Sequence, residues 1–419
     1  MQLFGLFLLL ILYGIPVAFG FVIAGIIYVY FVGDVSFSEI ITVSYGGLDS
    51  FVLLSVPLFI FAGDLMKYGG ITSKLIDFGS LFFKRGGSGL GGITVLSSTF
   101  FGAITGSSAA SVATIGSIMV PEMEKQGFSK PYAASLASAS GFIGILIPPS
   151  IPLIIYGLSA GASISDLFIA GIVPGVLVAV AFIVLNIFLT KRYASQTGTP
   201  KQNKQPVWKV FIRALPGLIL PVIILGGIYS GIFTPTESAG VAVIYAIVIG
   251  LFVTKSYKIN ELPKIALESA ITSGSVLVII GFATFFGRLL TINQIPATIS
   301  EFLTGITESS FVLLIIINII FLLFGMFLET STAIMILTPI LLPVATQIGV
   351  DPIHFGVIMV LNLGIGLITP PMALNLFVAS QVSNVPFKQL VRPSLPFLYV
   401  SVILLIMLTF IPEIALILL

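Results

Sequence analysis

Small hydroxyl residues and paired prolines interrupt apolar segments in two regions of this sequence. The first region contains Gly106-Ser107-Ser108-Ala109-Ala110-Ser111 and, after a short polar loop, Pro148-Pro149-Ser150. The second contains residues 329–333 (ETSTA) and Pro370-Pro371. Lipid offers no hydrogen-bond partner, so a helix breaks at membrane depth only where protein or a polar cavity satisfies its backbone. The freed carbonyl and N–H groups are suited to bind cations and anions, so the sequence predicts a binding site with two halves.

These two regions belong to an internal duplication. At an offset of 222 residues, the spacing from Pro148 to Pro370, glycines and prolines recur as the same residue type. The matched residues are Pro121, Gly127, Gly144, Pro148, Pro149 and Pro174 with Pro343, Gly349, Gly366, Pro370, Pro371 and Pro396. A repeat of this kind with interrupted apolar segments is the sequence pattern of secondary transporters.

Composition places the chain in a membrane. Of the 419 residues, 57% are hydrophobic and only 8% are charged, which is more apolar sequence than a soluble core needs. Alternating strand patterns are absent, which argues against an outer-membrane barrel. The net charge of +2 gives no reason to expect nucleic-acid binding, and without cysteine there is no thiol chemistry. The fold class is therefore predicted to be an all-α polytopic membrane protein.

The apolar pattern divides the chain into five predicted parts. Two are predicted to move as a transport domain, each with a re-entrant hairpin (92–121 and 309–347) and a broken span (131–160 and 353–380). The others supply scaffold spans, an amphipathic arm at 67–85 with a second arm at 293–308, and the linker 191–213. Residues 3–32 form either one kinked span or, as we favour, two short helices. The boundaries are 1–90, 91–165, 166–308, 309–385 and 386–419.

Charge sets the predicted orientation. The linker 191–213 carries six Lys or Arg residues, with Trp208 as an interfacial anchor, so it lies in the cytoplasm. The first arm is basic, whereas the second carries only acids, Glu301 and Glu308. Equivalent segments with opposite charge bias predict an inverted repeat, whose hairpins enter from opposite sides and meet near the midplane.

Two sodium sites are predicted where each hairpin tip meets a broken span, because hydroxyls and backbone carbonyls supply oxygen ligands. Tight packing of small residues is the alternative explanation of such segments, but it accounts for neither the prolines nor the duplication. The first set is Ser107, Ser108, Gly144, Ile147 and Ser150, and the second is Thr330, Ser331, Gly366, Thr369 and Met372.

Substrate binding is assigned to Arg288, Ser107, Ser108, Ser111 and Asn375. Arg288 lies inside an apolar run, and an arginine fork matches a carboxylate bidentately. A structural ion pair or a side chain reaching the interface remains the alternative for Arg288.

Other ionisable residues near apolar runs have several interpretations. Asp64 is a structural partner, a residue at the lipid edge or a ligand, and Glu329 binds a cation or pairs with Arg288. Glu237 is expected to cap the following helix. The lone His354 is expected at a helix end, because no set of metal ligands surrounds it. No nucleophile with its base and no phosphate loop is found, so we predict that the protein is not an enzyme.

Seven stretches resemble the large membrane subunit (M, DctM-like) of tripartite ATP-independent periplasmic transporters, and the resemblance covers essentially the whole chain. They are 57–63 (PLFIFAG), 69–72 (GGIT), 101–108 (FGAITGSS), 147–152 (IPPSIP), 171–175 (GIVPG), 234–239 (TPTESA) and 368–372 (ITPPM).

The resemblance implies an elevator-type transporter of the bacterial inner membrane that is driven by sodium as coupling ion. It also implies a small four-helix membrane partner (Q) and a soluble periplasmic binding protein (P) that delivers an organic acid. We expect Q to be a separate chain, because the sequence starts directly with the M-like region. Sialic acid is favoured as substrate and a C4-dicarboxylate comes next, since family members carry several acids.

Three other functions remain as alternatives. A stand-alone ion-coupled carrier has similar paired hairpins but needs no binding protein. A passive channel or a membrane scaffold predicts sodium-independent flux or no flux, and it leaves the duplicated breaks unexplained.

Overall fold

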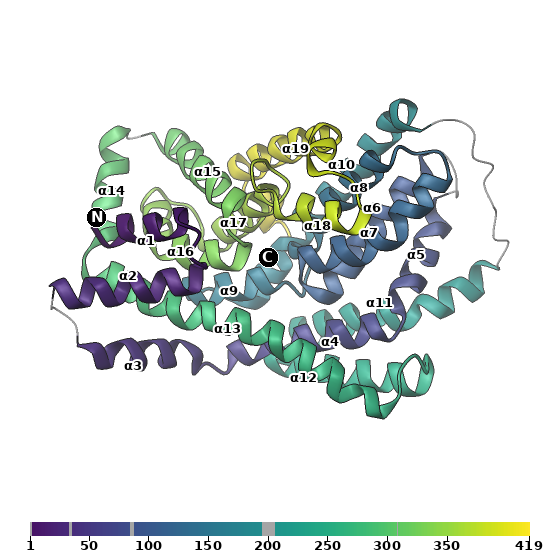
Figure 1. The fold of residues 1–419 in the computed structure, drawn as a ribbon, viewed down its shortest axis with the longest axis horizontal. Helices are drawn as coiled ribbons and strands as arrows, with labels where there is room; N and C mark the ends of the chain where they lie inside the picture. The colour runs from purple at the N-terminus through teal and green to yellow at the C-terminus, as the bar shows by residue number, and fades with distance from the viewer. Residues whose placement is uncertain (1, 33–35, 84–87, 195–205, 308) are drawn as a thin grey trace.

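The computed structural model describes residues 2–32, 36–83, 88–194, 206–307 and 309–419, which are built almost entirely from helices (Figure 1). Phe128 and Ala194 form an isolated antiparallel bridge. Among the described helices, seven are long and apolar enough to cross a membrane. The chain is therefore a multi-pass, all-helical membrane protein.

Helices α3 (Phe37–Leu48), α4 (Ser55–Tyr68), α12 (Pro235–Val248) and α13 (Leu262–Ile292) lie along one long edge of the molecule (Figure 1). Here α4 packs against α12 and α13, and α3 packs against α13. The amino-terminal helices α1 (Gln2–Leu12) and α2 (Val17–Val32) join this layer through a ring cluster of Phe7, Phe21 and Phe286, with centroids 4.8–5.2 Å apart. We call α3, α4, α12 and α13 the edge layer.

Two helix pairs turn back sharply at their tips. The first consists of α6 (Gly89–Thr105) and α7 (Ser108–Lys125), and the second of α15 (Ser310–Phe327) and α16 (Thr330–Gln347). The first turn needs a glycine, because Gly106 ends α6 with φ 61°, a left-handed conformation that other residues rarely adopt. We call these pairs hairpin 1 and hairpin 2.

Two other helices break at the paired prolines. One runs from α8 (Lys130–Gly141) through the short turn Phe142–Ile145 to α9 (Ile151–Ala160). The other runs from α17 (Pro352–Gly366) to α18 (Leu374–Ser383). The peptide bonds Pro148-Pro149 and Pro370-Pro371 are cis. Proline has no N–H to donate along a helix, so each helix ends before its pair and a new one starts after it.

The remaining helices surround these units: α5 (Ile71–Phe82), α10 (Ile164–Tyr193), α11 (Val207–Tyr229), α14 (Ile295–Ile306), α19 (Phe387–Phe410) and α20 (Glu413–Leu416). The arm α5 packs between α6 and α11, and α14 packs on α16. On the other side, α19 packs against α8, α10 and α17.

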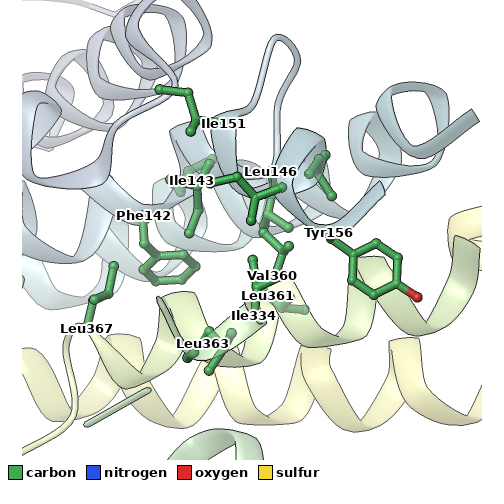
Figure 2. Packing of buried hydrophobic residues seen from close by; sticks show 14 of the residues in the cluster. Phe142, Ile143, Leu146, Ile151, Tyr156, Ile334, Val360, Leu361, Leu363 and Leu367 are labelled. Atoms are coloured by element: carbon green, nitrogen blue, oxygen red, sulfur yellow. The ribbon is translucent and has the colours of Figure 1, made fainter. Parts of the chain in front are cut away.

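The two broken helices share one buried core. Figure 2 shows Phe142, Ile143 and Leu146 of the first packed against Val360, Leu361 and Leu363 of the second. The Tyr156 hydroxyl also donates a 2.6 Å hydrogen bond to the carbonyl of Pro352. Hairpins and breaks are thus held to one another by a continuous apolar cluster.

Two equivalent polar contacts occur in the two halves of the chain, at positions that are 222 residues apart. The Tyr132 hydroxyl donates to Oδ1 of Asn186 (2.9 Å), and Nε2 of His354 lies 2.7 Å from the carbonyl oxygen of Leu408. Tyr132 and His354 are 222 positions apart, as are Asn186 and Leu408. Both pairs join a broken helix to the long helix behind it, α10 or α19.

Several predicted boundaries were wrong. The structure contains a helix, α3, that the sequence pattern did not predict, because its apolar residues alternate with Ser, Glu and Gly. The linker 191–213 is shorter than predicted, because α10 continues to Tyr193 and α11 starts at Val207, so Trp208 belongs to a helix. Lys201, Lys204, Glu308 and part of the arm 67–85 lie outside the described residues. The amino-terminal segment forms two helices, as favoured.

Candidate functional site

A cavity of about 330 Å³ separates the edge layer from the tips of both hairpins. Helices α4 and α13 form one wall, and the hairpin tips with α9 and α18 form the other. The polar residues that line it are Asp64, Lys67, Thr105, Ser107, Ser108, Thr272, Glu329, Thr330, Ser331 and Asn375. The two halves of the sequence therefore meet at one cavity, as the duplication predicts.

The tip of hairpin 1 presents the amino-terminus of α7 to this cavity. Ser107 is the N-cap residue, and its hydroxyl accepts a 3.4 Å hydrogen bond from the N–H of Ala110. Ser108, Ala109 and Ala110 line the cavity behind it. The first N–H groups of a helix have no acceptor within the helix, and the helix dipole makes that end positive. This tip therefore carries backbone donors and no charged side chain.

The tip of hairpin 2 is capped differently. Glu329 is the N-cap residue of α16, and its carboxylate accepts from the N–H groups of Ser331 (2.9 Å) and Thr332 (3.3 Å). It also accepts from the hydroxyl of Ser331 (3.1 Å). Glu329 itself is exposed to the cavity. A carboxyl group that belongs to the protein thus occupies the positive end of this helix.

Asn375 joins the second broken helix to hairpin 1. Its amide nitrogen Nδ2 donates to the Ser108 hydroxyl (2.7 Å) and to the carbonyl of Ser138 (3.2 Å). The side chain is completely buried, and Oδ1 has no hydrogen-bond partner within the part of the chain that the structure describes. A buried acceptor without a partner is energetically costly, so the two hydrogen bonds of Nδ2 are what holds this side chain in place.

The wall formed by the edge layer holds a compact polar cluster. Asp64 on α4 accepts a 2.6 Å hydrogen bond from the Ser269 hydroxyl on α13, and Tyr68 donates to Glu268 at 2.6 Å. Lys67 lies between Asp64 and Tyr68 in α4 and is exposed at the cavity. These hydrogen bonds fix α4 to α13 and place charges of both signs on the cavity wall.

Of the first predicted sodium set, Ser107 and Ser108 line the cavity. Gly144 instead lies directly against Gly102 of hairpin 1, and Ile147 packs on Gly175. The hydroxyl of Ser150 caps α9, where it accepts from the N–H of Leu153 and donates to the carbonyl of Ile145. The structure therefore places Gly144 and Ser150 in the break that packs behind the tip.

Of the second set, Thr330 and Ser331 line the cavity. Gly366 contacts the backbone of Gly325, and Thr369 donates a 2.7 Å hydrogen bond to the carbonyl of Ile365. Met372 is 49% exposed. As at the first break, small residues bring the unwound segment close to its hairpin.

The structure does not bring Arg288 or Ser111 to the cavity. Arg288 is exposed near the far end of α13, while the α13 residues in the cavity wall are Thr272 and Val276. Ser111 is buried inside hairpin 1 and donates to the carbonyl of Ser98 (3.1 Å). Arg288 lies 16 residues along α13 from Thr272, and Ser111 points into hairpin 1, so their role in substrate binding stays a prediction that this cavity does not support.

Sequence reasoning missed Lys67 as a cavity residue and Ser138 as a partner of Asn375. Lys67 was assigned to the basic arm, although it is one helical turn from Asp64. Among the described residues, no group of three or more His, Asp or Glu could hold a metal ion. The cavity wall offers hydroxyl groups and the carboxyl groups of Asp64 and Glu329 as oxygen ligands.

The sequence of this chain is similar to those of known proteins. The family described as "Tripartite ATP-independent periplasmic transporter, DctM component" matches residues 4–414. The chain is 40% identical to the C4-dicarboxylate TRAP transporter large permease protein DctM of Pseudomonas aeruginosa, over 88% of this chain and 86% of that one. It is 35% identical to the sialic acid TRAP transporter large permease protein SiaM of Vibrio cholerae, over 97% and 95%.

A third relative is longer, and one solved structure shows the fold. The isethionate TRAP transporter permease protein DctMQ of Oleidesulfovibrio alaskensis is 39% identical over 98% of this chain, which spans 65% of that protein's length. The YdaH transporter of Alcanivorax borkumensis has a similar fold, with a TM-score of 0.62 at 16% identity over 89% of this chain and 88% of that one. The chain belongs to the DctM component family of tripartite ATP-independent periplasmic transporters.

Proposed function

We propose that the protein is the large membrane subunit of a sodium-coupled importer of organic acids in a bacterial inner membrane. The observation that carries this proposal is the cavity between the edge layer and the two hairpin tips, because it collects the interrupted segments of both halves. Family membership supports the assignment to transport.

The two halves are proposed to form an inverted repeat that moves as an elevator. Support comes from the paired prolines and from the equivalent contacts of Tyr132 and His354, all at one offset. The shared core in Figure 2 would let hairpins and broken helices move as one body against the edge layer. Alternating access by movement of one packed body of helices against another needs a division of this kind.

The cavity is proposed to open toward the cytoplasm. Its wall includes Lys67 near the carboxyl end of α4 and Thr272 in the amino-terminal half of α13. The adjoining loop before α13 carries Lys255 and Lys258, and positive loops remain on the cytoplasmic side.

Sodium is the proposed coupling ion. Its ligands are proposed to be the hydroxyls of Ser107, Ser108, Thr330 and Ser331 together with carbonyls in the two breaks, the second near Gly366 and Thr369. Hydroxyl and carbonyl oxygens at half-helix ends suit a monovalent cation without placing a full charge in the bilayer. Glu329 would add a negative charge on the side of hairpin 2.

The substrate is proposed to be an organic acid, with sialic acid ahead of a C4-dicarboxylate. Relatives are named for sialic acid, C4-dicarboxylates and isethionate, all of them anions. A small membrane subunit and a periplasmic binding protein are the proposed partners, and the binding protein would deliver the acid.

Uptake into proteoliposomes that contain this chain and its small subunit tests the proposal. We expect inward sodium gradients to drive uptake of radiolabelled sialic acid only when the cognate binding protein is added. Uptake of succinate is measured in parallel, with its own candidate binding protein. Sodium-driven uptake without any binding protein would support a stand-alone carrier. Uptake that does not depend on sodium would refute sodium coupling.

A further inference from the structure

A second cavity, of about 350 Å³, lies between the edge layer and helices α9 and α16. Helices α9, α13 and α16 contribute to the walls of both cavities, and α3 joins them in the second. None of the described residues that line it carries a charge, and its polar side chains are the hydroxyls of Ser50, Ser159, Thr284 and Thr291. We call the cavity at the hairpin tips cavity 1 and this one cavity 2.

The two cavities lie toward opposite ends of one interface. Along α13, cavity 1 is lined by Thr272 and Val276, whereas cavity 2 is lined by residues from Ile280 to Thr291. A helix rises 1.5 Å per residue, so Thr272 and Thr291 are about 28 Å apart along the axis, close to the roughly 30 Å of a hydrocarbon core. Helices α9 and α16 follow the same order, with Ile151, Pro152, Thr330 and Ser331 at cavity 1 and Ile155, Leu158, Ser159, Met335 and Pro339 at cavity 2.

A short segment of the edge layer lies between the two cavities in the chain. The helical turn Val52–Leu54 follows Ser50, which lines cavity 2, and precedes Ile60, which lines cavity 1. This turn packs against α9 on the hairpin side and against α12 within the edge layer. Leu53 is its buried residue and is only 2% exposed, whereas the neighbouring Leu54 is 53% exposed. Leu53 is therefore the apolar side chain that this turn encloses at the interface.

Helix α12 holds this turn in place. The Thr236 hydroxyl, in the first turn of α12, donates a 2.9 Å hydrogen bond to the carbonyl of Phe51, the residue before the turn. The start of α12 is fixed by a capping box, in which Thr234 and Glu237 each accept from the N–H group of the other. The turn is thus anchored to the edge layer on one side, while its other side contacts α9, which belongs to the body that is proposed to move.

We propose that the turn Val52–Leu54 and α9 form an apolar seal between two water-filled cavities on opposite sides of the membrane, with Leu53 as its central residue. This rests on the transport function proposed above, in which cavity 1 opens toward the cytoplasm, so cavity 2 opens toward the periplasm. An apolar constriction stops ions because it excludes water. Sodium that leaked past α9 would dissipate the gradient that drives uptake, so the seal maintains the coupling.

Cysteine labelling tests the sidedness of the cavities, because the chain has no cysteine of its own. Ser159→Cys, Thr272→Cys and Leu53→Cys are each produced in the complex with the small subunit. A membrane-impermeant methanethiosulfonate is added to right-side-out and to inside-out membrane vesicles without substrate, and label on this chain is quantified by mass spectrometry. We expect Ser159→Cys to react faster in right-side-out vesicles, Thr272→Cys to react faster in inside-out vesicles, and Leu53→Cys to react in neither.

The loss of an imposed sodium gradient tests the seal itself, in proteoliposomes that contain the complex with neither substrate nor binding protein. Leu53→Ala should lose the gradient about tenfold faster than wild type, because a constriction that admits water no longer presents its full barrier to an ion. Leu54→Ala removes the same atoms from the exposed side of the same turn and should match the wild type. Thr236→Val should also leak, because it loses the hydrogen bond to Phe51, and Thr236→Ser should restore the seal.

Equal leaks from Leu53→Ala and Leu54→Ala would refute the seal, and so would an unreactive Ser159→Cys or faster labelling of both cavities from the same side. Thermal unfolding of the purified complex verifies each variant, and Thr236→Val and the labelling remain decisive if Leu53→Ala does not fold. The outcome is separable from that of the proposed function. If sodium drives uptake by the wild type while the two leucine variants leak equally, only the seal is refuted. If the labelling and the leaks are as expected but sodium drives no uptake of any acid, the transport function fails.

Discussion

Replacing Gly144 by alanine should disturb the first break without removing any polar group. A Cβ at this position would lie 2.3 Å from Cα of Gly102 and 2.9 Å from its carbonyl carbon. Carbon atoms pack best at about 3.5–4.0 Å, so the break and hairpin 1 must separate by roughly 1 Å. Both contacts are backbone atoms, which cannot rotate out of the way as a side chain could.

The expected cost follows from this overlap. Forcing extra volume into a packed core usually costs about 1–3 kcal/mol, which should lower the thermal unfolding midpoint of the purified complex. The displaced segment includes the carbonyl groups proposed as sodium ligands, so the stabilisation that sodium confers should also weaken. We expect the sodium concentration for half-maximal stabilisation to rise about tenfold, which corresponds to about 1.4 kcal/mol.

Gly116→Ala in α7 of hairpin 1 provides a matched control. Its Cβ would meet Cβ of Ala137 at 3.7 Å and Cγ1 of Val382 at 3.9 Å, which are ordinary contacts. Alanine in a helix is favoured over glycine by up to about 1 kcal/mol, so this variant should be as stable as the wild type or more so. Unchanged sodium stabilisation in Gly144→Ala, or equal losses in both variants, would refute the reasoning.

Three further predictions concern single residues. Arg288→Ala should leave the substrate concentration for half-maximal uptake within about twofold of wild type, because Arg288 is exposed and outside the cavity wall; abolished uptake by a folded variant would contradict this placement. Thr369→Val should raise the half-maximal sodium concentration for uptake about tenfold if Thr369 belongs to the second sodium site, while retained sodium dependence would remove it from that set. Asn186→Leu should cost about 1–3 kcal/mol in thermal unfolding, because it leaves the Tyr132 hydroxyl and the Ser88 carbonyl without their partner; Tyr132→Phe in the same background should recover part of that loss.

Much of the fold follows from local sequence patterns. Apolar runs locate the long helices, and the paired prolines locate both breaks, because two adjacent residues without an N–H group cannot continue the helix ladder. Single prolines such as Pro121 and Pro174 stay inside their helices. The polar clusters around Ser107 and Glu329 locate both hairpin tips, because residues that cap a helix mark where it begins. Ser107 caps α7, and Glu329 caps α16. Helix α3 escaped prediction, because a helix whose polar and apolar residues alternate gives a weak signal.

The candidate site was only partly predictable. The sequence identified Ser107, Ser108, Thr330 and Ser331, since residues at a helix start are marked by local capping chemistry. It could not show that Lys67 faces the cavity while Arg288 does not, because that depends on how α4 and α13 are rotated against the hairpins.

The sequence by itself therefore determined the membrane class, the duplication, the breaks and the family. These follow from composition and from residues that act on their own neighbourhood. Only the tertiary structure decided which side chains meet, such as Asn375 with Ser108 across 267 positions, and which buried polar atoms of the described residues lack a partner. The physical reason is that hydrogen bonds form over about 3 Å in space, whereas sequence patterns describe order only along one helix.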